Sequence, residues 1–397
     1  MGFERYVNQE IVRIAREIIA QRESICDHCL GRQFAQIGHG FTNAKRGKAI
    51  RKIIGLKKKP GPCPVCRDFF KNLEKISERI VEALKDFEFK TFVVGTKLDG
   101  DLIKREESLW EDVGIKYCES IKSEINRELG KLIERKTGKK ADRENPEITI
   151  ILNTEDMDFE IEPSPLYIYG RYKKLVRGIP QTKWDKYPET VEDIIAEPFM
   201  NLTGGETHSF HGMGREDIDA RCLDWRPFVL EIKKPKRRNI DLKKAEREVN
   251  KSEKVRVSGL RFSNKEEVVR VKDARPDKTY RVIVEFEKPL NKEDLEKIKS
   301  LVGEIHQRTP ARVLHRRADA LRKRKVKEIG IRMINNKKLE LEIKGEAGLY
   351  IKELVTGDNG RTKPSLAEII GKTPRVVELD VIKIHWKEGE RKNGKDE

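Results

Sequence analysis

A glycine-rich stretch that runs straight into alternating charges offers this chain its best place for chemistry. It spans residues 204–221, holds four glycines, and continues into Arg215, Glu216, Asp217 and Asp219. The glycines leave a backbone that can turn sharply or lie close to a ligand. An ionised carboxylate between guanidinium groups stays charged even when it is partly buried. The pattern fits a reactive carboxylate, and the alternative is a solvated loop with incidental ion pairs.

Four of the six cysteines form two CxxC pairs, the spacing of metal-binding knuckles; they are Cys26, Cys29, Cys63 and Cys66. Two such turns can aim four thiolates at one tetrahedral zinc ion. The intervening residues 30–62 exceed the usual spacing of a zinc ribbon and predict a structured insert. We expect a closed, structural zinc site, with free or redox-active thiols as the alternative. Cys118 and Cys222 stand alone and are expected to be buried thiols.

The overall charge points to a polyanionic partner. The 397 residues carry a formal net charge of +17, with 39% charged and 37% hydrophobic residues. Lysine and arginine that neutralise phosphates release counterions, which gives sequence-independent affinity for nucleic acid. The rival polyanion is a membrane surface, but no apolar run approaches the ~18 residues of a spanning helix. The first 22 residues are charged throughout, so we expect a soluble, cytoplasmic protein with a thermophile's charged surface.

The elements that must position these residues follow from apolar periodicity. In the first part of the chain we expect helices over residues 5–22, 69–84 and 115–133, and strands over 89–95, 148–153, 158–162 and 166–169. Residues 67–175 therefore predict a compact α/β module. A cluster of cations and aromatic residues follows over 170–187 and includes Trp184. It suits phosphates and unstacked bases, and the alternative is a solvated hairpin.

The second part of the chain predicts mostly strands. We expect strands over residues 227–232, 279–286, 329–334, 338–343, 349–354 and 376–386, and helices over 189–199, 290–302 and 367–370. The basic run at residues 233–238 is expected to be exposed and to face a phosphate backbone, and residues 307–326 form the densest basic segment. The tail after residue 388 has no apolar side chain and is expected to fray.

The sequence lacks the motifs that several kinds of catalysis require. No GxGxxG opens a helix after a strand, and no GxxxxGK[ST] is present, so nucleotide cofactors and ATP hydrolysis have no anchor. His208 and His211 form an HxxH without matching ligands, so we do not expect a metal there. What remains is a carboxylate with arginines beside heavy positive charge. That set fits a cofactor-free reaction on RNA, in which an aspartate attacks or deprotonates the sugar of an unstacked nucleotide.

Several motifs carry a specific resemblance. Residues 214–217, Gly-Arg-Glu-Asp, resemble the G-R-x-D signature of pseudouridine synthases, and longer matches cover residues 26–34, 211–221, 312–322 and 357–366. Together with the second CxxC, they make the chain similar to the archaeal tRNA pseudouridine-54/55 synthases, the family numbered ten among the Pus enzymes. The resemblance spans nearly the whole chain.

The resemblance implies an α+β protein in two domains. Residues 1–175 would form a zinc-knuckle and THUMP-like α/β RNA-binding domain, and residues 176–390 a pseudouridine synthase catalytic domain with a mixed, mainly antiparallel sheet. Residues 391–397 would be a frayed tail. The implied activity is isomerisation of uridine to pseudouridine at positions 54 and 55 in the T-loop of tRNA, with structural zinc and no organic cofactor. The second hypothesis is a non-catalytic, zinc-dependent tRNA-binding protein, and a monomer is the default.

The resemblance also assigns roles to residues. Asp217 would be the catalytic aspartate, ranked above Asp219 and Asp224 by the family pattern alone. Tyr280 would stack on the target uracil near its C5 proton, and the cation of Lys352 would pair with the aspartate. The remaining substrate-binding residues we expect are Arg215, Ile351, Leu379, Arg316 and Arg317. Lys352 or Arg215 is expected to keep Asp217 ionised.

Overall fold

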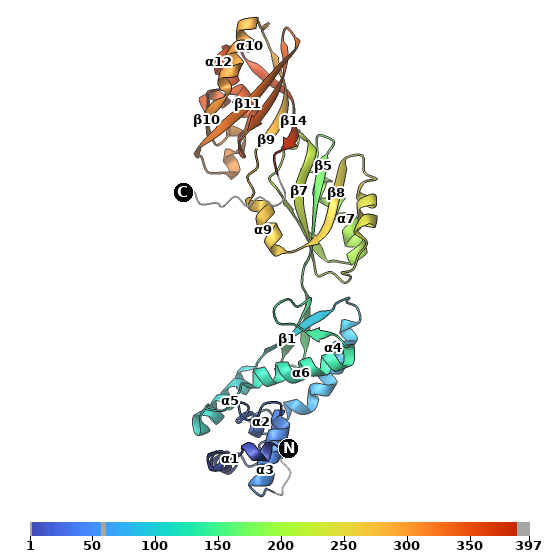
Figure 1. Cartoon of the computed structure of the whole chain (residues 1–397), viewed down its shortest axis with the longest axis vertical. Coiled ribbons are helices and arrows are strands. Elements are labelled where there is room, and N and C mark those ends of the chain that lie inside the picture. Colours follow the sequence, from blue (N-terminus) through green and yellow to red (C-terminus); the bar gives the residue numbers. More distant parts are fainter. Residues whose placement is uncertain (1, 57–60, 387–397) are drawn as a thin grey trace. The chain divides into compact units, whose positions relative to one another are not determined.

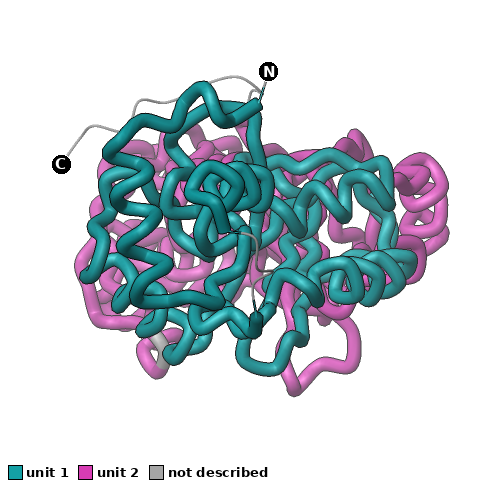
Figure 2. Tube along the Cα trace, turned by 90° about the horizontal axis from the view of Figure 1, so that it is seen from below, with its two compact units in different colours: residues 1–164, 234–238 teal, residues 165–233, 239–397 magenta. Residues whose placement is uncertain are grey.

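The computed structural model describes residues 2–56 and 61–386, which fall into two compact units (Figures 1 and 2). Unit 1 comprises residues 1–164 with 234–238, and unit 2 comprises residues 165–233 with 239–397. The expected frayed tail and the lysine run at 57–59 lie outside the described residues. In the described ranges, no helix has the length and apolar character needed to cross a membrane.

Unit 1 is mainly helical. Its helices are α1 (Gln9–Gln21), α2 (Asp27–Arg32), α3 (Asn43–Ile53), α4 (Leu73–Leu84), α5 (Gly100–Val113) and α6 (Ile121–Thr137), with 3-10 turns η1 (Phe3–Tyr6) and η2 (Phe69–Asn72). The amphipathic spacing correctly predicted α1 and α4, whose apolar faces are buried. The predicted start of α6 at residue 115 was wrong, because the Ser120 side chain accepts a hydrogen bond from the Ser123 amide and caps the helix there.

A small sheet completes unit 1. Its strands are β1 (Thr91–Lys97), β2 (Lys140–Ala141), β3 (Ile148–Asn153) and β4 (Phe159–Pro163), in the order β2-β1-β3-β4. Strand β1 is parallel to β3, and such a pair needs a long crossover, which α5 and α6 provide. Leu129 and Ile133 of α6 are fully buried in the same core as Phe92 and Ile150 of the sheet.

Unit 2 contains a large sheet, ten-stranded within the described residues, in the order β13-β10-β11-β12-β9-β14-β7-β5-β8, with β6 paired to β7. Its strands are β5 (Leu166–Lys174), β6 (Thr207–Gly212), β7 (Arg221–Lys233), β8 (Val255–Ser263), β9 (Lys278–Phe286), β10 (Gly303–Arg308), β11 (Leu321–Asn335), β12 (Lys338–Gly345), β13 (Thr362–Lys363) and β14 (Pro374–Ile384). Among the described strands of this sheet only β14 and β7 pair in parallel. The expected mixed, mainly antiparallel sheet is confirmed.

Helices cover this sheet in two groups. They are α7 (Val191–Thr203), α8 (Leu242–Val249), α9 (Lys265–Asp273), α10 (Lys292–Ile298), α11 (Ile351–Thr356) and α12 (Leu366–Ile370), with 3-10 turns η3 (Lys299–Leu301), η4 (Ala311–Arg316) and η5 (Asp358–Gly360). Helices α7 and α8 share a core with β5, β7 and β8, while α10, α11 and α12 share one with β9 and β12. Helix α9 packs on the face of β7 that carries Val229.

Two sequence expectations for unit 2 were wrong. Strand β5 was assigned to the N-terminal module, but it pairs with β7 and β8 in the large sheet. Residues 349–354 were expected as a strand, but α11 begins at Ile351, and a helix of six residues is too short to display its period. The glycine-rich stretch, for which no element was predicted, contains β6 at residues 207–212.

Candidate active site

A cavity of about 400 Å³ in unit 2 gathers most of the residues that the sequence singled out. Those that line it are Arg215, Asp217, Tyr280, Arg317, Ile351, Lys352 and Leu379. They come from the loop after β6, from β9 and β14, from the segment after β10, and from α11. The fold thus brings together segments that are more than a hundred residues apart in sequence. Arg316 ends η4, and its side chain lies outside the described part of the structure.

The loop that carries Asp217 is fixed from behind by buried polar groups. Gly214 opens it with φ +69°, a conformation that glycine adopts without strain. Glu216 points inward, where it accepts a hydrogen bond from the Tyr172 hydroxyl (3.0 Å) and lies 3.2 Å from the Arg226 guanidinium. The fully buried Lys174 donates to the Asp217 carbonyl oxygen at 3.1 Å. With its neighbours anchored, the Asp217 carboxylate faces the cavity.

Two cations flank the Asp217 carboxylate, which is 35% exposed. The Arg312 Nη2 atom lies 3.2 Å from Asp217 Oδ2, and the Lys352 Nζ atom lies 3.3 Å from the same oxygen. Arg215 lines the cavity, but among the described contacts it makes no ion pair with Asp217. The expected pairing of Lys352 with Asp217 is therefore present in the geometry, whereas the guanidinium beside Asp217 is that of Arg312.

Each of the two flanking cations also pairs with a carboxylate of its own. Lys352 Nζ donates to both oxygens of Asp219 at 2.7 Å, and Arg312 Nε donates to Glu353 Oε1 at 2.8 Å. Burial acts to raise the pKa of Asp219, but the hydrogen bond and charge of Lys352 outweigh it, so this pKa lies below its ordinary value. The four groups and Asp217 form one ion network at the cavity wall.

Tyr280 and apolar side chains make the other walls. Tyr280 lies in β9 between Ile343 of β12 and Val381 of β14. Burial raises the pKa of its phenol to about 12, so the hydroxyl stays protonated at neutral pH. Ile351 and Leu379 are 4% and 7% exposed and present apolar surface. A planar ring of the size of a nucleobase fits between an aromatic face and such an apolar wall.

Sequence reasoning missed three polar residues of this site. Arg312 stands in a motif that carried the family resemblance, but nothing in its spacing assigned it to Asp217. Glu353 is 5% exposed and positions Arg312. Lys278 also lines the cavity, and burial, together with the charge of Arg226, lowers its pKa to about 8. A lysine on an alternating strand gives no sequence signal that it points inward.

The two histidines of the HxxH pattern bind carboxylates. His208 Nδ1 lies 3.1 Å from Glu192 Oε1, and His211 Nε2 lies 2.8 Å from Glu231 Oε2. Among the described residues the one group of at least three potential metal ligands is the cysteine cluster. These histidines are therefore part of the polar packing around β6.

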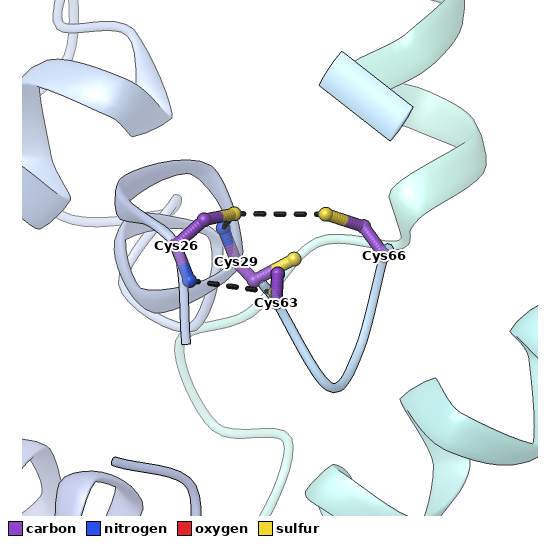
Figure 3. A group of neighbouring side chains, drawn as sticks. All are labelled: Cys26, Cys29, Cys63 and Cys66. Carbon is purple, nitrogen blue, oxygen red and sulfur yellow. Dashed lines mark hydrogen bonds between the residues drawn. The ribbon is translucent and has the colours of Figure 1, made fainter. Parts of the chain in front are cut away.

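The four cysteines of the CxxC pairs converge in unit 1, where their side chains turn toward one another (Figure 3). Their Sγ atoms all lie within 4.8 Å of one another, and those of Cys26 and Cys66 are 3.6 Å apart. A tetrahedral zinc ion with Zn–S bonds of about 2.3 Å requires sulfur atoms about 3.8 Å apart. The donor set and its dimensions therefore fit a metal ion with four thiolate ligands and no open position.

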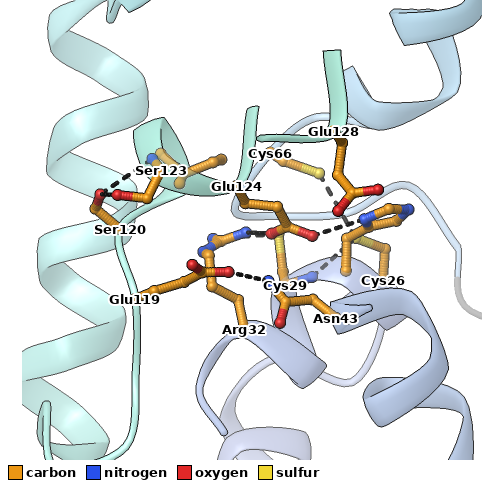
Figure 4. A network of polar contacts seen from close by, with 12 residues as sticks. Cys26, Cys29, Arg32, Asn43, Cys66, Glu119, Ser120, Ser123, Glu124 and Glu128 are labelled. Carbon is orange, nitrogen blue, oxygen red and sulfur yellow. Dashed lines mark hydrogen bonds and ion pairs between the residues drawn. The ribbon is translucent and has the colours of Figure 1, made fainter. Parts of the chain in front are cut away.

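A buried ion network connects this cluster to α6, as Figure 4 shows, and also to α5. Arg32 has no exposed surface and donates to Cys29 Sγ at 3.5 Å, to Glu124 at 3.0 Å and to Glu106 at 3.2 Å. His28 Nδ1 lies 2.8 Å from the other oxygen of Glu124. Because the cation is shared between a ligand sulfur and two carboxylates, the knuckle and the α/β part of unit 1 form one packed body.

Comparison with known proteins bears on the whole chain. Residues 167–385 match the family model described as Pus10, C-terminal, and residues 76–153 match the Pus10 THUMP domain, archaeal. The tRNA pseudouridine synthase Pus10 of Pyrococcus furiosus is 42% identical over 382 residues, which cover 94% of this chain and 98% of that protein. The enzyme of the same name from Methanothrix thermoacetophila is 40% identical over 413 residues, with 91% of each chain covered.

A solved Cbf5-Nop10-Gar1 complex also aligns with 54% of this chain and 48% of the solved chain, at 18% identity and a TM-score of 0.32, which is too low to add to the argument. The family matches and the sequence relatives suffice, and they confirm the resemblance that the motifs indicated. The chain belongs to the Pus10 family of tRNA pseudouridine synthases.

Proposed function

We propose that this protein isomerises uridine to pseudouridine at positions 54 and 55 in the T-loop of tRNA, with Asp217 as the catalytic carboxylate. The observation that carries the proposal is the placement of Asp217, between Arg312 and Lys352, at the wall of a cavity whose other walls are Tyr280 and apolar side chains. The reaction needs these elements: a charged carboxylate, an aromatic face for the base, and space for the base to turn.

The roles of the residues follow from this geometry. Asp217 breaks the N-glycosidic bond by attacking the sugar or by taking a ribose proton, and its carboxylate lies between the cations of Arg312 and Lys352. The freed uracil stays against Tyr280 and the apolar surface of Ile351 and Leu379, turns, and rejoins through C5. The C5 hydrogen leaves as a proton, so no electrons are gained or lost and no organic cofactor is required.

The cations at the mouth of the cavity suit the RNA backbone. Arg215 and Arg317 line the cavity with exposed side chains, and Arg317 Nη1 donates to the Tyr350 hydroxyl at 2.9 Å. We propose that Arg215, Arg316 and Arg317 contact phosphates of the bound tRNA. Unit 1 would bind RNA, and unit 2, which includes β5, would carry out catalysis.

We propose zinc as the ion of the four-cysteine cluster and a folding role for it. A closed set of four thiolates leaves no coordination position for a substrate, so the ion would supply folding energy and no Lewis acid. We propose a monomer as the default oligomeric state. Reduced thiols at a metal site and a tRNA substrate suit the cytoplasm.

The test is release of tritium from a tRNA transcript labelled at C5 of uridine, with wild-type protein, Asp217→Asn and Asp219→Asn. Wild type should release tritium, and Asp217→Asn should release none while it still binds tRNA. Asp219 is the matched control because it is a neighbouring carboxylate paired with the same lysine, but 66% exposed. An exposed ion pair contributes at most about 1 kcal/mol, so Asp219→Asn should stay within about fivefold of wild type.

Three outcomes of this test distinguish the isomerase from a non-catalytic tRNA-binding protein. Loss in Asp217→Asn alone supports the assignment, and mapping of the product by reverse transcription after carbodiimide treatment tests positions 54 and 55. Equal loss in both variants would contradict the role of Asp217. Tight tRNA binding by wild type without tritium release would contradict the proposal and favour a non-catalytic tRNA-binding protein. We do not expect that outcome, because a protein that only binds tRNA would not need a charged carboxylate beside an apolar pocket.

A further inference from the structure

A second, smaller hollow lies beside the catalytic cavity and shares its wall. Its volume is about 220 Å³, and it is lined by Asp217, Arg215, Arg312 and Lys352 together with residues that do not line the catalytic cavity. Two of those additional residues are Trp184 and His315. Asp217 is therefore common to both spaces, so a molecule in the second hollow would lie directly beside a base held in the first.

Trp184 is an exposed aromatic side chain beside this hollow. It lies in the segment between β5 and α7, and its side chain is 40% exposed. The chain has only four tryptophans and 39% charged residues, so an exposed indole is unusual on its surface. The Tyr187 amide donates to the Trp184 carbonyl at 2.9 Å, and the Tyr187 ring lies 5.4 Å from the indole. The Lys186 ammonium is 5.9 Å from the indole centroid. These neighbours hold an exposed aromatic platform in place.

The structure divides the cation and aromatic cluster of residues 170–187 in two. Tyr172 and Lys174 are fully buried in β5, where they fix the Asp217 loop. Trp184 stays at the surface and borders the hollow. A solvated hairpin would leave the indole without a pocket, so the location of Trp184 beside the reacting carboxylate favours the base-binding interpretation of this part of the cluster.

We propose that this hollow binds the nucleotide next to the target uridine, with its base stacked on Trp184. The proposal rests on the proposed function, because it needs a uridine in the neighbouring cavity. An RNA base offers a flat π face to an indole whatever its identity. Arg215 lines the hollow and the Lys186 ammonium lies near the indole, so both cations are available for phosphate oxygens. Adjacent nucleotides need adjacent subsites with a common wall, and Asp217 supplies that wall.

The binding test uses tRNA with 2-aminopurine at the nucleotide 5′ or 3′ of the target, bound to Asp217→Asn protein so that no turnover occurs. In one of the two labelled RNAs, Trp184→Ala should raise the fluorescence of the bound probe, because the indole no longer quenches it. Trp184→Phe should restore part of the quenching. The control is Phe262→Ala, which removes a 44% exposed aromatic side chain of β8 and should change nothing.

A second measurement separates stacking from a general effect on folding. In the wild-type background, Trp184→Ala should weaken binding of intact tRNA about 5- to 150-fold, the range measured for stacking of one base. On a tRNA that lacks the base at the responding neighbour, the same substitution should have no effect. An equal penalty on both RNAs, no penalty on either, or no fluorescence response at either neighbour would overturn the proposal.

The two proposals can fail independently. Both measurements above report binding and do not need turnover. If tRNA binds with the predicted dependence on Trp184 but wild-type protein releases no tritium, the subsite stands and the isomerase assignment fails. If tritium is released normally and the Trp184 variants behave like Phe262→Ala, the isomerase stands and the subsite is refuted.

Discussion

Asp380 is the residue whose removal we expect to damage the catalytic unit most. It is 1% exposed and lies in β14, opposite Arg221 of β7 and Arg281 of β9. Arg221 Nη2 donates to it at 2.7 Å and Arg281 Nη2 at 2.8 Å, and Arg177 donates to its other oxygen. The parallel pairing of β14 with β7 spans two residue pairs and joins the two halves of the sheet. Asp380 thus holds the halves together at their shortest connection.

The size of the effect follows from the pKa of Asp380. Burial acts to raise this pKa, but the bonds from Arg221 and Arg281 and the charge of Arg177 outweigh it and lower the pKa from the ordinary 3.8 to about 2. A shift of this size corresponds to about 2 kcal/mol of stability. Asp380→Asn would also leave three guanidinium groups facing one another, and a buried charge without its partner costs about 3–5 kcal/mol. The arginines are 28–34% exposed, and solvent screens part of their repulsion, so we expect a loss of about 2–4 kcal/mol.

Glu378→Gln is the matched control. Glu378 lies two residues earlier in the same strand and pairs with Arg177 at 2.9 Å and Arg221 at 3.8 Å, but it is 48% exposed. Exposed pairs contribute about 0–1 kcal/mol, so this variant should remain close to wild type. The free energy of unfolding of both variants is measured by urea titration. It is taken from the transition that a metal chelator does not affect, because that transition belongs to unit 2.

The pH dependence of this loss of stability tests the role of Asp380. Because the pKa of Asp380 is lowered in the folded protein, its contribution is complete above about pH 4 and is lost as the pH falls toward 2. The difference in unfolding free energy between wild type and Asp380→Asn should therefore be constant from pH 7 to 5 and shrink between pH 4 and 3. A difference no larger than that of Glu378→Gln, or one that is unchanged at pH 3, would refute this account.

Three further predictions concern the metal, the RNA and a buried lysine. Removal of the metal with a chelator should abolish the unfolding transition of unit 1 and leave that of unit 2 unchanged, and added zinc should restore it, as calorimetry would show. The double change Arg316→Ala with Arg317→Ala should weaken tRNA binding and reduce the slope of log Kd against log salt by about 1–2, and an unchanged slope would contradict phosphate contacts there. The pKa of Lys278 is lowered to about 8, so the unfolded chain binds more protons above pH 8 and the stability of unit 2 should rise between pH 8 and 9.5. Lys278→Met should remove that rise in urea titrations, and a rise that persists would refute it.

The fold was predictable from sequence wherever burial follows one period. Helices α1 and α4 show a complete apolar stripe, and β9 and β12 alternate cleanly, so their extents were close to those observed. The assignment of β5 to the N-terminal module was wrong because alternating burial predicts a strand but does not indicate which sheet the strand joins. That choice depends on its hydrogen-bond partners β7 and β8, which lie far along the chain.

The site was predictable only through motifs. Asp217, Tyr280, Lys352 and Leu379 stand on four separate segments, and no local spacing relates them. The family pattern identified them, and the structure places all four at one cavity. It did not identify Glu353, whose importance lies in a contact with the Arg312 side chain 41 positions earlier. Long-range side-chain contacts of this kind leave no periodic trace in a single sequence.

The distances within the ion network explain how a carboxylate can be both charged and available. Arg312 and Lys352 bind their supporting carboxylates, Glu353 and Asp219, at 2.8 and 2.7 Å, which is ordinary for charge-assisted hydrogen bonds. The same cations approach Asp217 only to 3.2 and 3.3 Å. The supports therefore hold the cations more closely than Asp217 does, and Asp217 receives their positive potential without being tightly bound. A carboxylate that has to reach a ribose needs this arrangement, because every short hydrogen bond to it would have to break before it could react.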